Sequence, residues 1–284
     1  MPQPSQSAPA TRRLATHALR ASSVVLLAAL HCQIAVRSAS AGPSALASQG
    51  VLDGLPHWRI YQSRVLGPLL MGSIERWTGL GYVQAYVLSV LLALLGMHAL
   101  LWMLYARLAL GQLRSWLLSL GLIALSALLL LRGQWFYVWD ALNLTFVSAF
   151  VLAVLWPFRL GVLSLIFAAA LLTHELALIM PAWLILDQVC DAWQQRRVQR
   201  RHVLIVSSSL LVCFLASRLI EWLRSAFLVR EIGPEIFLDY DARFADPSLQ
   251  WHLLPNLAEL GRALLALEPR ALLAPALLLW LGLS

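Results

Sequence analysis

The stretch that decides the fold class runs from Tyr82 to Tyr105 and reads YVQAYVLSVLLALLGMHALLWMLY. It contains no Asp, Glu, Lys or Arg. A helix of about 20 apolar residues is long enough to cross the hydrocarbon core of a bilayer. Tyr82 at one end, and Trp102 and Tyr105 at the other, are residue types that favour the membrane–water interface. The run therefore predicts a transmembrane α-helix.

The composition of the whole chain supports a membrane location. Of its 284 residues, 60% are hydrophobic and only 12% are charged, with a mean hydropathy of +0.75. A soluble domain carries about a quarter charged residues, so most of this surface must face an apolar medium, for which a lipid bilayer is the expected partner. The net charge is +7, and all 21 basic residues are arginines. These arginines lie singly or in small groups between apolar runs, a pattern that does not indicate nucleic-acid binding.

Other apolar runs predict further spans. Trp116–Leu131, Tyr137–Trp156 and Val203–Trp222 can each cross the bilayer once flanking aromatic residues are counted. Leu160–Leu186 is too long for one ordinary span and carries Thr173-His174-Glu175 near its middle. We expect two short helices that meet at this polar junction, because one continuous helix would bury a glutamate in mid-bilayer.

The two ends of the chain leave alternatives open. We expect residues 1–20 to form a disordered cytoplasmic tail, and residues 21–36 to be either a retained first span or the core of a signal peptide. Residues 271–284 are apolar but reach only about 21 Å as a helix. Neighbouring helices complete this last segment, or the chain is truncated at its C-terminus; we expect truncation.

These segments predict an all-α, polytopic transmembrane helical bundle of about seven or eight spans, including the split pair. Residues 21–284 would form one transmembrane domain with outer loops over residues 38–81 and 223–270. In the first outer loop, Val65–Trp77 has apolar residues near helical spacing and charges at its ends, which predicts an amphipathic helix in the membrane interface.

The arginines predict the orientation. With the N-terminus in the cytoplasm, Arg107, Arg114 and Arg159 fall inside, as the positive-inside rule requires. The cluster Arg196–Arg201 also falls inside, but only if Leu160–Leu186 crosses the membrane twice. The charge pattern therefore favours the split pair.

Several ionisable residues near the spans are candidate site residues, because such groups are costly in a membrane and usually face a cavity or a partner. Asp140 is either an interfacial carboxylate, solvated by headgroup water or paired with Arg132, or a site residue. Glu175 either caps a helix or forms an ion pair, or His174 and Glu175 together are a site that binds or transfers protons at the helix break.

Two outer regions add further candidates. Arg218, Glu221 and Arg224 follow one another at helical spacing, so they form either an intrahelical ion pair or a clamp for a phosphate, which suits the arginine fork. Asp53 and Arg64 lie in the first outer loop, where solvated charges are the alternative. The three cysteines are far apart and have no metal-ligand spacing, so we expect no metal site; the sequence does not indicate a cofactor.

All of these candidates fall on the predicted outer side, whereas the inner loops contain only the arginines that orientation explains. This asymmetry predicts a polar cavity that opens outward.

The segments Tyr61-Gln-Ser-Arg64-Val-Leu-Gly-Pro68, Phe136-Tyr-Val-Trp-Asp140 and Thr173-His-Glu175-Leu-Ala-Leu resemble a pattern in bacterial polytopic membrane proteins. The layout over residues 21–225 is similar to the GT-C superfamily of glycosyltransferases, which use polyprenyl-phosphate sugars. The resemblance implies a bacterial inner-membrane enzyme that acts on a lipid-linked sugar at the outer face.

The same resemblance implies roles for individual residues. Asp53 would be the catalytic base, Arg218 or Arg224 would hold the lipid phosphate, and Asp140 with Glu175 would line the sugar pocket. We also treat Arg64 and His174 as substrate-binding candidates. The alternatives are a membrane transporter component, for which the broken helix is typical, and a non-enzymatic membrane assembly partner.

Overall fold

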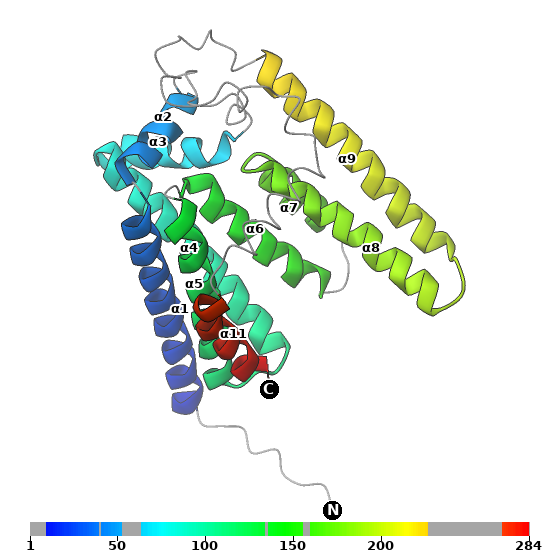
Figure 1. The fold of residues 1–284 in the computed structure, drawn as a ribbon, viewed down its shortest axis with the longest axis horizontal. Coiled ribbons are helices and arrows are strands. Elements are labelled where there is room, and N and C mark those ends of the chain that lie inside the picture. The colour runs from blue at the N-terminus through cyan, green and yellow to red at the C-terminus, as the bar shows by residue number, and fades with distance from the viewer. Residues whose placement is uncertain are drawn as a thin grey trace, which may run out of the picture.

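The computed structural model describes residues 10–39, 41–52, 64–133, 136–155, 160–226 and 269–283, and every regular element in these ranges is a helix (Figure 1). The predicted all-α class is therefore confirmed for the described part of the chain. In chain order the elements are α1 (Ala10–Ser38), α2 (Ala41–Leu52), α3 (Leu66–Thr78), α4 (Tyr82–Arg107), α5 (Gln112–Gly133), α6 (Val138–Val154), α7 (Leu160–Leu171), the 3-10 helix η2 (Glu175–Leu178), α8 (Ile179–Gln194), α9 (Arg200–Ala226) and α11 (Pro269–Leu283).

Three helices in the described residues are long and apolar enough to cross a membrane. They are His17–Ser38 within α1, Tyr82–Arg107 (α4), and Leu176–Gln194, which covers most of η2 and all of α8. These helices are compatible with an integral membrane protein. Shorter apolar stretches occur in α5, α6, α7 and α11, so the total of seven or eight spans stays a prediction.

α4 is the central helix among the N-terminal helices α1 to α6. It packs against α1, α3 and α6, and two side-chain hydrogen bonds tie it to the α6 region. The Tyr86 hydroxyl donates to the Phe136 carbonyl at 2.5 Å, and the Thr145 hydroxyl donates to the Ala93 carbonyl at 2.6 Å. A side chain at Gly96 would meet the Thr145 methyl group at 3.2 Å. Small and hydroxyl-bearing residues thus let the two helices approach closely, as is common between membrane helices.

α5 and α11 also pack closely, through glycines on both helices. A Cβ atom at Gly121 would lie 2.9 Å from the Leu279 side chain, and one at Gly282 would lie 2.6 Å from Leu118 Cγ. The C-terminal apolar segment, which is too short to span a bilayer alone, is therefore covered along one side by α5.

The helices α7, α8 and α9 follow α6 in the chain. α7 packs against α6, and α8 packs against α9 as an antiparallel hairpin (Figure 1). Large apolar side chains remain exposed on these helices, including Leu165, Leu186 and Phe214. Apolar patches of this kind suit a lipid environment better than water.

The structure differs from the sequence-based expectations at the N-terminal side. α1 begins at Ala10, so residues 10–20 are helical where we expected a disordered tail. Alanine, leucine and arginine dominate this stretch and are good helix formers, and the stretch continues directly into the apolar helix. α2 was not predicted, because its serines and glycines weaken the apolar pattern.

α3 lies where the amphipathic helix was predicted, over Leu66–Thr78 instead of Val65–Trp77. Its buried face carries Gly67, Pro68, Met71 and Ile74, whereas Trp77 is 82% exposed. Its location in a membrane interface stays a prediction.

Two histidines meet between α1 and α4. His31 Nδ1 and His98 Nε2 are 3.4 Å apart, and both side chains are buried. Such a bond needs a donor and an acceptor, so at least one imidazole is neutral. The outer ring atoms, His31 Nε2 and His98 Nδ1, have no hydrogen-bond partner among the described residues. The pair therefore links α1 to α4, but it leaves one ring nitrogen of each histidine buried without a hydrogen bond from the described residues.

Replacing one histidine should cost more stability than replacing both. His98→Leu leaves the inner nitrogen of His31 without its partner, and we expect a loss of about 1–3 kcal/mol. The double variant His31→Leu/His98→Leu removes both polar groups and should regain most of that loss. Thermal unfolding in detergent measures the difference; a double variant that loses the sum of the single losses would contradict this interpretation.

Candidate functional site

Asp140 is positioned by the start of α6. Tyr137 is the N-cap residue in an extended conformation, and its backbone N–H donates to Asp140 Oδ2 at 2.9 Å. The carboxylate thus satisfies a backbone donor that the helix cannot satisfy itself. Its negative charge also suits the positive end of the helix dipole. This bond fixes the carboxylate at the N-terminus of α6.

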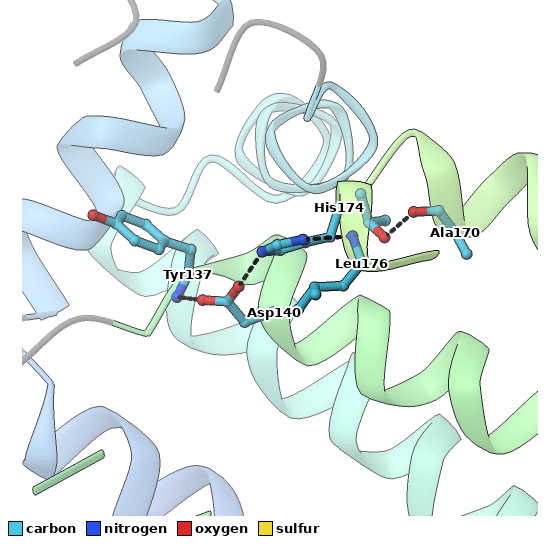
Figure 2. A network of polar contacts seen from close by, with 6 residues as sticks. Tyr137, Asp140, Ala170, His174 and Leu176 are labelled. Atoms are coloured by element: carbon cyan, nitrogen blue, oxygen red, sulfur yellow. Dashed lines mark hydrogen bonds and ion pairs between the residues drawn. The ribbon is translucent and has the colours of Figure 1, made fainter. Parts of the chain in front are cut away.

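The predicted break in Leu160–Leu186 is present. α7 ends at Leu171, and His174 is extended and caps η2 (Figure 2). The backbone N–H groups of Thr173 and His174 both donate to the Ala170 carbonyl at 2.9 Å, and the Thr173 hydroxyl donates to the same carbonyl at 2.5 Å. The break is therefore held by local hydrogen bonds around one carbonyl group.

The His174 side chain caps the helix that follows the break, η2. Its Nδ1 accepts the Leu176 backbone N–H at 3.0 Å (Figure 2). An accepting Nδ1 carries no proton, so the ring is neutral and its proton is on Nε2. The ring thereby presents a single N–H donor on its far edge.

That donor faces Asp140. His174 Nε2 lies 4.0 Å from Asp140 Oδ1, and the side chains are 18% and 30% exposed. This distance is longer than a hydrogen bond, so the two groups are neighbours that point toward each other without closing a direct bond (Figure 2). An N–H donor and a carboxylate acceptor therefore lie side by side in a partly exposed position.

Arg64 reaches the same region from the start of α3. Its guanidinium carbon lies 5.7 Å from the centre of the Trp139 ring, and only 6% of the residue is exposed. Trp139 is fully buried and stacks on Tyr137 with ring centres 4.4 Å apart. A cation over an aromatic face is favourable, so Arg64 is held against the N-terminal turn of α6.

Two backbone contacts bring the three segments together. The Leu66 N–H donates to the Leu172 carbonyl at 3.1 Å, which ties the start of α3 to the helix break. A Cβ at Gly67 would lie 2.9 Å from the Trp139 backbone nitrogen. Only glycine permits this approach of α3 to α6. We call Arg64, Trp139, Asp140 and His174 the polar cluster; they come from the segment before α3, the first turn of α6 and the break between α7 and η2, helices that Figure 1 shows.

Four further residues were predicted as site residues: Asp53, Glu175, Arg218 and Arg224. Asp53 lies outside the described residues. Glu175 is the first residue of η2 and follows His174 directly, so its backbone adjoins the polar cluster. Arg218 is exposed near the C-terminal end of α9, a helix that packs on α8, and Arg224 lies one to two turns further along α9.

Sequence reasoning brought Arg64, Asp140 and His174 forward separately and placed them on one side, but it did not pair them. It missed Trp139 and Gly67, although both stand in the quoted motifs. The suggested partner of Asp140, Arg132, has a side chain outside the described set; the structure instead gives Asp140 a neighbour in His174. No group of three His, Cys, Asp or Glu side chains in the described residues is placed to hold a metal ion, and none of the three cysteines forms a disulfide.

Comparison of the chain with protein-family models, with curated proteins and with solved structures gave no match. The interpretation of the polar cluster therefore rests on its own geometry.

Gly67→Ala should separate α3 from α6. The added methyl group meets backbone atoms of Trp139, which cannot rotate away, and we expect a loss of about 1–3 kcal/mol. Gly161→Ala in α7 is the matched control, because a Cβ there meets nothing within 4 Å and alanine favours a helix by up to about 1 kcal/mol. Unfolding midpoints in detergent measure both changes; equal effects would contradict the close approach.

Proposed function

We propose that this chain is an integral membrane protein that binds a lipid-linked sugar at the polar cluster and transfers the sugar as a GT-C-like glycosyltransferase. In this proposal the membrane is the bacterial inner membrane, the N-terminus is cytoplasmic, and the cluster lies at the outer face. The donor would be a polyprenyl-phosphate sugar that diffuses in the bilayer.

The observation that carries the proposal is the pairing of a donor and an acceptor at His174 and Asp140. A sugar hydroxyl both accepts and donates hydrogen bonds. A hydroxyl oxygen between the two groups would accept the His174 Nε2–H and donate its own proton to Asp140 Oδ1, across a gap of 4.0 Å that is too long for a direct bond. Bonds to a carboxylate are the stronger kind, so this pair suits the recognition of a polyhydroxylated ligand.

The partner groups keep this pair in place. Asp140 Oδ2 is held by the Tyr137 N–H, and His174 Nδ1 is held by the Leu176 N–H. Because Nδ1 of His174 can take up a proton only by losing the bond from the Leu176 N–H, the ring suits binding better than proton transfer. The proposal therefore gives the role of catalytic base to Asp53, which would deprotonate the acceptor hydroxyl as it attacks the sugar carbon.

The other roles follow from charge. Lipid phosphate leaves with the polyprenyl chain when the sugar is transferred, and its negative charge needs a cation nearby. Arg218 and Arg224 on α9 are the proposed phosphate ligands, and Glu175 is a proposed further contact to the sugar. Arg64, which is buried against Trp139, would hold the start of α6 in position.

A transporter component is the second candidate, and the broken helix favours it. Discontinuous helices at membrane depth commonly form the substrate sites of transporters, and the segment from α7 through η2 to α8 is discontinuous at residues 172–174. Such a protein would release its ligand unchanged on the other side of the membrane.

The sugar proposal is tested by binding of short-chain polyprenyl-phosphate hexoses to the purified protein. Asp140→Asn retains an oxygen for the Tyr137 N–H but loses the charge, and we expect Kd to rise about tenfold or more. Asp191→Asn is the matched control, since Asp191 also lies beside a histidine, with 3.4 Å between its Oδ2 and His202 Nε2. Equal weakening by both variants, or no binding by the wild type, would contradict the proposed site.

The same preparation separates binding from transfer. Asp53→Ala should bind the donor as the wild type does and release no sugar from it. Continued transfer by this variant would remove Asp53 from the mechanism. Movement of intact donor across liposome membranes, without cleavage, would contradict the glycosyltransferase proposal and favour the transporter proposal.

A further inference from the structure

The turn between α8 and α9 borders an open cavity at the surface of this hairpin. The cavity measures about 700 Å³, within the usual range for ligand pockets. It lies at the turn of the α8–α9 hairpin, which Figure 1 shows, and none of the residues that line it belongs to the polar cluster. Its lining combines both helices and the turn: Gln188, Val189, Ala192, Trp193, Arg196, Arg197, Val198, His202, Val203, Val206 and Ser207.

The lining is amphiphilic. Val189, Val203 and Val206 give it an apolar wall, and Trp193, which is 84% exposed, stands at its edge. Arg196 and Arg197 line the cavity at the turn, and Arg200 and Arg201 follow in the first turn of α9. Positive charge beside an apolar wall is the chemistry that fits an acidic phospholipid, which joins an anionic headgroup to acyl chains.

The hairpin is also held in a fixed shape. His202 is buried; its Nδ1 accepts the Gln199 N–H, and its Nε2 lies 3.4 Å from Asp191 Oδ2 across the hairpin. Arg196 has a φ of 48°, in the left-handed region that a non-glycine residue rarely adopts. The turn therefore places two adjacent arginines at the cavity in a constrained geometry. Orientation in the membrane explains positive charge here, but it does not require a cavity.

We propose that this cavity binds an acidic phospholipid, with its phosphate at Arg196 and Arg197 and an acyl chain along Val189, Val203 and Val206. The arginine fork can donate two hydrogen bonds to phosphate oxygens. The site depends on membrane insertion and is independent of the sugar proposal.

Native mass spectrometry of the purified full-length chain tests the proposal, with dioleoyl phosphatidylglycerol and dioleoyl phosphatidylcholine as probes. The wild type should bind phosphatidylglycerol about tenfold more tightly. Arg196→Asn/Arg197→Gln should abolish this preference, and asparagine keeps the turn because it tolerates a positive φ. Val206→Trp, which fills the cavity and leaves the charge unchanged, should weaken binding of phosphatidylglycerol as well.

The control variant is Arg107→Gln/Arg114→Gln, which removes an arginine from the end of α4 and one from the start of α5 and should leave the preference unchanged. Circular dichroism and size-exclusion profiles establish that each variant is folded. The proposal is overturned by a wild type without preference, or by an unchanged preference in Arg196→Asn/Arg197→Gln. It is equally overturned by an equal loss in the control, or by Val206→Trp binding as the wild type does.

Discussion

A helix that breaks inside an apolar run exposes backbone N–H and C=O groups that need hydrogen-bond partners, because lipid and packed side chains offer none. At residues 172–174 the chain meets this constraint with groups from three segments. The Ala170 carbonyl accepts bonds from Thr173 and His174, the Leu172 carbonyl accepts the Leu66 N–H, and the His174 ring accepts the Leu176 N–H. These bonds fix His174 and place the start of α3 beside the break, which brings two of the segments of the polar cluster together.

The satisfied break has a chemical consequence. Using Nδ1 of His174 for the backbone fixes the tautomer and directs Nε2–H toward Asp140. Using one oxygen of Asp140 for the start of α6 likewise directs the other oxygen toward His174. Two backbone requirements, each local, therefore create a donor and an acceptor aimed at a common point. This arrangement underlies the proposed binding of a sugar hydroxyl.

The sequence predicted the features that depend on local pattern. The charge-free run at Tyr82–Tyr105 became α4, and Thr173-His174-Glu175 marked the helix break, because both follow from the cost of placing polar groups among apolar ones. It could not predict that His174 faces Asp140 or that Gly67 touches Trp139, since those contacts depend on how α3, α6 and α7 pack. α2 was missed because small residues give a helix little apolar periodicity. Asp53 lies outside the described residues, and its role stays a prediction.

The contact between Leu66 and Leu172 tests the assembly of the polar cluster most directly. In a variant with Cys32, Cys190 and Cys213 replaced by alanine, cysteines at positions 66 and 172 should be joined by a short bifunctional maleimide, because a backbone hydrogen bond of 3.1 Å keeps the two residues adjacent whichever way their side chains point. A cysteine at position 165, two turns earlier and about 10 Å further along α7, should not link to position 66. Crosslinking of both pairs alike, or of neither, would contradict the joining of α3 to the helix break.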